Sequence, residues 1–239
     1  MTAPPGRPRA PEYGTAWVYE SIVGAVPGAN LTGGRGVLVQ FVLFETSVLA
    51  LAWAYGLPDA AVAGTVAVAV AAAGSVGVLR VGRTVRAVDP PETYRRLLFG
   101  SSIEVVLAVV AFAGLVTYLF VVDPASPPGS LLASLFGPDP PAPAVFLALL
   151  VLWDLCYRIG VSWWAAVVAL WRSRRLRFEA GAARTLRRAD ATNVAFALTQ
   201  LALLPFLRNQ PVLWYAVAGH VVAVVVVSTL AALSLRVRD

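Results

Sequence analysis

The segment from Pro141 to Trp171 restricts the fold of this chain more than any other part of it. It is an almost continuous run of apolar residues, and it exceeds the about 20 residues that a helix needs to cross a bilayer. Yet Asp154 and Arg158 stand near its middle. Because a charge at the centre of a membrane helix costs about 2.5–3.5 kcal/mol on insertion scales, neither side chain is expected to face lipid. The segment therefore predicts a helical bundle with a polar interior.

The spacing of Asp154 and Arg158 also predicts how they interact. Four residues apart, they share one face of a helix, with the acid on the N-terminal side, which is the better order for an ion pair. We expect them to bind each other, and we expect Arg158 to meet a second carboxylate from a neighbouring helix if the contact is structural.

The composition agrees with a membrane protein and excludes a soluble domain. Hydrophobic residues make up 59% of the 239 residues and charged residues only 13%, whereas soluble proteins average about 25% charged residues. The single cysteine, Cys156, excludes an intramolecular disulfide and a cysteine-based zinc site. Because there is also only one histidine, we predict no metal site and no other cofactor.

The predicted fold class is all-α, an integral membrane bundle of six transmembrane helices within residues 33–239. The first two spans are joined by a turn that contains Gly56 and Pro58, and the last two by a turn that ends at Pro211. The helices therefore pair as three hairpins. The predicted spans are Gly36–Tyr55, Ala60–Leu79, Leu97–Val122, Ala144–Trp171, Ala191–Leu207 and Val212–Leu235.

Residues 1–32 are predicted to form a cytoplasmic tail with a short interfacial amphipathic helix. The first residues are rich in proline and glycine, which is typical of a disordered segment. The stretch Thr15–Val26 is too short to span a membrane, and Trp17 and Tyr19 are residue types that settle at the headgroup level. We therefore expect this stretch to lie on the membrane surface.

Local composition gives three further expectations about the spans and loops. Pro205 should kink or end the fifth span near the outer surface. The segment Ser130–Phe136, bracketed by prolines, should lie flat on the membrane. The second span should be central and tightly packed, because it carries a row of small residues that lets helices approach closely: Ala63, Ala67, Ala71 and Ser75.

The arginines predict the orientation of the chain in the membrane. All nineteen basic residues are arginine, and all but two lie in segments that would share one side of the membrane. The exceptions are Arg158, within a span, and Arg208, in the loop before the last span. Because cytoplasmic loops are enriched in basic residues, both termini are predicted to be cytoplasmic, in the cell membrane. This explains the net charge of +6 without nucleic-acid binding, for which the sequence offers no motif.

Polar residues at membrane depth predict a buried cluster. If ionised, its three carboxylates would outnumber its one arginine, which is costly in a low dielectric. One interpretation is a structural or regulatory scaffold feature that fixes how the helices register. The alternative is a proton- or cation-linked transporter or channel that uses carboxylates near the midplane. The members are Glu45, Glu104, Asp154, Arg158, Gln200 and His220.

A remote alternative is an intramembrane hydrolase. Ser162 in the fourth span and His220 in the sixth resemble the serine and histidine of the rhomboid proteases. However, Trp163 stands where that family has a glycine after the serine. The two residues are also expected to lie roughly 12 Å apart along the membrane normal, too far for a nucleophile and its base. We therefore assign no catalytic residue.

The segment between the fourth and fifth spans is strongly basic. We predict that its arginines bind anionic lipid headgroups or a cytoplasmic partner, or form a solvated loop that only sets the orientation. They are Arg172, Arg174, Arg175, Arg177, Arg184, Arg187 and Arg188.

Three phrases of the sequence carry a resemblance to a known family. They are EYGTAWVYESIVGAVPG (Glu12–Gly28), YRRLLFGSSIEVVL (Tyr94–Leu107) and LWDLCYRIGVSWWA (Leu152–Ala165). The chain resembles an uncharacterised family of multi-pass membrane proteins of halophilic archaea. This resemblance implies a prokaryotic plasma membrane and no particular activity.

Overall fold

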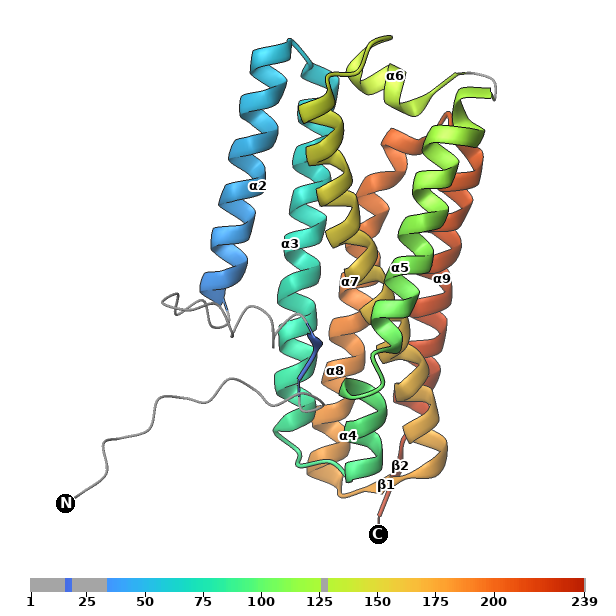
Figure 1. Cartoon of the computed structure of the whole chain (residues 1–239). Helices are drawn as coiled ribbons and strands as arrows, with labels where there is room; N and C mark the ends of the chain where they lie inside the picture. The colour runs from blue at the N-terminus through green and yellow to red at the C-terminus, as the bar shows by residue number, and fades with distance from the viewer. Residues whose placement is uncertain (1–15, 19–33, 126–128, 239) are drawn as a thin grey trace, which may run out of the picture.

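The computed structural model describes residues 16–18, 34–125 and 129–238. Within these ranges the protein is a bundle of long helices that run side by side (Figure 1). Six of the described helical segments are long and apolar enough to cross a membrane, which confirms the predicted fold class. They are Gly34–Tyr55 (α2), Pro58–Arg86 (α3), Glu92–Ala125 (α4, α5 and two short turns), Ala142–Arg175 (α7), Ala180–Leu207 (α8 and η3) and Pro211–Leu233 (α9).

The two ends of the bundle differ in character (Figure 1). One end holds α4 (Glu92–Phe99), the C-terminus and the arginine-rich ends of α3, α7 and α8, and we call it the basic end. The opposite end is covered by α6 (Leu131–Phe136), and we call it the α6 end.

Helices α3 and α7 form the centre of the bundle. Helix α7 packs against α3, α5 and α9, and α3 also packs against α2 and α8. Small residues allow this: a Cβ added at Gly74 would lie 2.6 Å from the Phe196 ring of α8. The expectation that the second span is central is therefore confirmed, and its close packing is observed around Ala71, Gly74 and Ser75, which are buried.

The third span is interrupted, which the sequence analysis did not anticipate. Helix α4 ends at Phe99, and α5 (Ile103–Thr117) begins after Ser102, whose φ of 53° lies in the left-handed region. Gly100, Ser101 and Ser102 explain the break, because glycine is flexible and serine hydroxyls compete with helical hydrogen bonds. Beyond α5 the helix continues as a π-helical turn, η1 (Tyr118–Val122), and a 3-10 turn, η2 (Asp123–Ala125).

The predicted interfacial helix at Thr15–Val26 lies mostly outside the described residues. Of its two aromatic residues, Trp17 is described, and its side chain is fully buried. Its ring meets the Phe99 ring edge-on, with 4.9 Å between centroids. Trp17 therefore packs against α3 and α4 at the basic end.

The basic segment after the fourth span is shorter than predicted and largely helical. Helix α7 continues to Arg175, and α8 (Ala180–Thr199) begins five residues later. Alanine, leucine and arginine are strong helix formers, which explains why the helices extend through this segment. Between them, β1 (Arg177–Phe178) pairs in parallel with β2 (Arg236–Val237) after α9.

The fifth span changes its helix type near Pro205. Proline lacks a backbone N–H and clashes with the carbonyl four residues before it. The α-helix accordingly gives way to a 3-10 helix, η3, over Gln200–Leu207. This agrees with the disruption expected at Pro205.

Helices α5 and α7 are in close contact at Gly160. A Cβ added at Gly160 would lie 2.7 Å from the backbone oxygen of Glu104 and 3.0 Å from the backbone nitrogen of Ala108. Because backbone atoms cannot rotate away, only glycine fits there. The contact fixes the depth of the buried Glu104 relative to α7.

Replacing Gly160 by alanine should lower the thermal stability of the protein, because the two helices would have to separate. Gly114→Ala on α5 is the matched control, since an added Cβ there meets nothing within 4 Å, and alanine exceeds glycine in helix propensity by about 1 kcal/mol. Thermal unfolding in detergent measures both variants. Equal midpoints for the two would contradict the close contact at Gly160.

Candidate functional site

Asp154 and Arg158 form an ion pair within the bundle. The Arg158 Nη2 lies 2.7 Å from the Asp154 Oδ1, and the side chains are 0% and 13% exposed for arginine and aspartate. The Gln40 side chain of α2 also hydrogen-bonds Asp154. The guanidinium lies 5.4 Å from the centroid of the Tyr157 ring. The pair thus faces protein and joins α7 to α2.

The structure places the other predicted cluster members in separate surroundings. Glu45 is half-buried and accepts a hydrogen bond of 2.7 Å from the Thr65 hydroxyl of α3. The ring of His220 lies against that of Trp163, with 6.3 Å between centroids. Glu104 and Gln200 are fully buried, and among the described residues their side chains make no hydrogen bond to another residue.

A second polar contact joins three helices near the middle of α7. Ser162 donates a hydrogen bond of 2.9 Å to the Asn193 Oδ1 of α8. The Asn193 amide in turn donates to the Ser162 carbonyl and to the Ser228 hydroxyl of α9, at 3.0 and 3.1 Å. The Ser162 hydroxyl is therefore bound to Asn193, and Trp163 stands beside His220, an arrangement unlike a serine–histidine pair.

A third contact, centred on Arg172, lies near the basic end. Arg172 donates to the Tyr94 hydroxyl of α4 at 2.8 Å and to the Asp190 carboxylate of α8 at 2.5 Å. The side chains of Arg172 and Asp190 are 2% and 5% exposed. Arg172 thus bridges α4, α7 and α8. Its assignment to the headgroup-binding arginines is corrected, because a buried, bonded guanidinium cannot reach lipid phosphates.

The remaining arginines of the basic segment are exposed at the basic end. Arg187 also donates hydrogen bonds to the carbonyl oxygens of Ala232 and Leu235, where α9 ends. Such a cation is favourable near the negative end of a helix dipole. The exposed set is Arg174, Arg175, Arg177, Arg184, Arg187 and Arg188.

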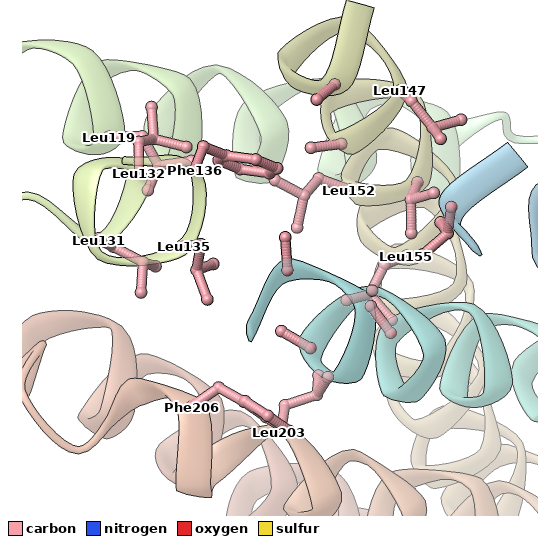
Figure 2. A pocket seen from close by; sticks show the side chains of 18 of the residues that line it. Leu119, Leu131, Leu132, Leu135, Phe136, Leu147, Leu152, Leu155, Leu203 and Phe206 are labelled. Atoms are coloured by element: carbon pink, nitrogen blue, oxygen red, sulfur yellow. The ribbon is translucent and has the colours of Figure 1, made fainter. Parts of the chain in front are cut away.

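An apolar cavity of about 230 Å³ occupies the half of the bundle nearest the α6 end (Figure 2). Helices α2, α3 and α7, the end of α5 with η1, η3 and the start of α9 form its walls. The four side chains of Leu131, Leu132, Leu135 and Phe136 reach it from α6. The sequence analysis did not identify this cavity, because the residues that line it come from seven separate stretches.

Polar contacts hold α6 over this cavity. The Asp123 carboxylate accepts a hydrogen bond of 2.6 Å from the Leu131 amide at the first turn of α6. Gln210, which is 4% exposed, accepts from the Tyr118 hydroxyl at 2.8 Å and donates to the Gly129 carbonyl at 3.0 Å. We call Tyr118, Asp123 and Gln210 the α6 clasp. The clasp joins the end of α5, the start of α9 and α6.

The fold and these contacts define a multi-pass helical membrane protein with buried polar connections between its spans. The chain belongs to a family of unknown function (DUF7530), whose model matches residues 12–231. No curated protein and no solved structure matches the chain. The expectation that the chain belongs to a family without an assigned activity is therefore confirmed. The source in halophilic archaea stays a prediction.

Replacing Asp190 by alanine should destabilise the protein by about 3–5 kcal/mol, because it leaves Arg172 charged and buried without its carboxylate. Glu92→Ala is the matched control: it breaks the Arg96–Glu92 pair, whose side chains are 77% and 59% exposed, at a cost of about 0–1 kcal/mol. Denaturant unfolding in mixed micelles measures both. Similar decreases in the free energy of unfolding for the two variants would show that burial of the Arg172–Asp190 pair does not add to its contribution to stability.

Replacing Gln210 by alanine should loosen α6, because it removes the bonds to Tyr118 and Gly129. Each bond contributes about 1 kcal/mol, so amide hydrogen exchange in α6 should quicken by roughly fivefold or more. Exchange followed by mass spectrometry would read the peptide that covers Leu131–Phe136. Asn209→Ala, a change at the exposed neighbouring residue, should leave this rate unchanged.

Proposed function

We propose that the protein is a membrane scaffold whose buried polar contacts fix the register of its helices. The observation that carries this proposal is that Asp154, Arg158 and Arg172, the charged residues of α7 that lie inside the bundle, are bound to partners. Arg158 bonds Asp154 on its own helix, and Arg172 bonds Asp190 on α8. Charges that are neutralised and bonded in this way stabilise one arrangement of helices and are poorly placed to exchange ions.

The packing around Asp154 supports a structural role for the pair. The cavity next to Asp154, lined by residues of α2, α3 and α7, has a volume of only about 10 Å³. A cavity needs roughly 10–15 Å³ to hold a single water molecule. Close packing of this kind favours a fixed contact over a water-filled path for ions.

The second candidate is a proton- or cation-linked transporter. Glu104 is fully buried, and neither of its carboxylate oxygens has a hydrogen-bond partner in another described residue. Gln200 is equally buried and equally without a partner there. Ionisable residues at membrane depth mark ion or proton paths in many transporters, and this observation supports the alternative.

We also propose an orientation in which the basic end faces the cytoplasm of a cell membrane. Arginines gathered at the ends of α3, α7 and α8 support this, because basic residues are retained on the cytoplasmic side. The exposed arginines from Arg174 to Arg188 would then meet anionic lipid headgroups. Each basic residue near such a surface contributes about 1 kcal/mol to binding.

Proton and cation flux into liposomes distinguishes the scaffold from the transporter. Wild type is compared with Glu45→Gln, Glu104→Gln and Asp154→Asn, and folding is checked by size-exclusion chromatography. The scaffold predicts no flux above empty liposomes in any of them. It also predicts a lower unfolding temperature for Asp154→Asn, because Arg158 loses its counter-charge.

Flux in wild type that disappears in a folded carboxylate variant would establish the transporter and contradict the scaffold. An unchanged unfolding temperature for Asp154→Asn would also contradict the scaffold, because the Asp154–Arg158 ion pair would then not stabilise the helix bundle.

A further inference from the structure

We propose that the cavity beneath α6 binds the hydrocarbon tail of one membrane lipid. This binding site is independent of the polar contacts along α7 and of the scaffold role proposed for them. The inference rests on the chemistry, shape and surroundings of the cavity.

The lining of the cavity is hydrocarbon throughout, apart from one thiol. All of the side chains around it belong to alanine, valine, leucine, isoleucine, phenylalanine or Cys156, with Gly64 adding backbone. A water molecule needs two to four polar partners in a cavity, and the only polar side-chain group in this lining is the Cys156 thiol. A cavity with such walls takes up an apolar occupant.

The shape of the cavity fits a chain better than a compact ring. Along α7 its lining runs from Ala144 to Ile159, a length of about 22 Å at 1.5 Å per residue. Along α3 it runs from Ala60 to Ala67. The cavity therefore extends along the bundle axis, in the direction in which lipid tails run.

Lipid tails are the apolar molecules beside this part of the bundle. The helices that line the cavity also carry large apolar side chains on their outer faces. Val62 of α3 is 58% exposed next to the lining residue Ala63, and Phe146 of α7 is 65% exposed next to the lining residue Leu147. These outer faces are the surface that bilayer hydrocarbon covers, so the apolar molecules nearest to the cavity are lipid tails.

The arrangement of α6 agrees with a cover over an occupied cavity. Its leucines and its phenylalanine point toward the space (Figure 2), whereas Ala133 and Ser134 on its other side are exposed. A six-residue helix has few contacts of its own, and the α6 clasp supplies the bonds that keep it in place.

Photolabelling with a phospholipid that carries a diazirine at the end of one tail tests the proposal. The full-length protein is placed in nanodiscs that contain this lipid, irradiated, digested and analysed by mass spectrometry. We expect adducts on inward-facing residues such as Leu135 of α6, Leu155 of α7 and Leu203 of η3, which Figure 2 shows around the cavity. Adducts confined to outward-facing residues such as Val62 and Phe146 in wild type would overturn the proposal.

Two variants on the same helix make the test specific. Ala63→Phe fills the cavity from α3 and should remove most of the inward-facing adducts. Ala69→Phe adds the same side chain on the exposed face of α3 and should leave them unchanged. Equal inward labelling in both variants would contradict the assignment. If Ala63→Phe does not fold, Ala148→Phe replaces it from the α7 wall, and the wild-type map decides the question by itself.

Discussion

The bundle depends on polar side chains spaced along α7. In a bilayer the hydrophobic effect does not drive helices together, so packing and hydrogen bonds between helices must do so. Asp154 reaches Gln40 of α2, Ser162 reaches Asn193 of α8, and Arg172 reaches Tyr94 of α4 as well as Asp190 of α8. One helix thus holds most of its neighbours, and a shift of α7 by one turn would break several of these contacts together.

Small residues provide the close packing that these polar contacts need. Gly74 of α3 leaves room for the Phe196 ring and for the stem of Arg158, and Gly160 lets α5 approach the backbone of α7. A buried charged pair adds little net stability by itself, because removing two charges from water is costly. It strongly disfavours arrangements that separate the pair. Close packing therefore brings the helices together, and the Arg172–Asp190 ion pair between α7 and α8 selects one register among the arrangements that such packing allows.

The sequence predicts the features that depend on residues close together in the chain. Helix number follows from the length of apolar runs, and the Asp154–Arg158 pair follows from a four-residue spacing. The Arg172–Asp190 and Tyr118–Gln210 contacts join residues 18 and 92 positions apart, and no local pattern says which helices meet. The segment from Arg172 to Arg188 was predicted to be a loop because it is rich in arginine, but arginine also favours helices. The composition therefore did not reveal that α7 and α8 extend through this segment, or that the Arg172 side chain is buried.

The contacts of Ser162 and Arg172 and the cavity occupy different parts of the bundle. Ser162 and Arg172 bond their neighbours in the half of α7 nearest the basic end. From Ala144 to Ile159 the face of α7 toward the cavity carries apolar side chains and the Cys156 thiol. On this face α7 makes contact with its neighbours by packing alone. There the proline-containing 3-10 helix η3 and the π-helical turn η1 also interrupt regular packing. The cavity therefore lies where regular helix packing is interrupted, and the hydrogen bonds of the α6 clasp hold the helix that covers its end.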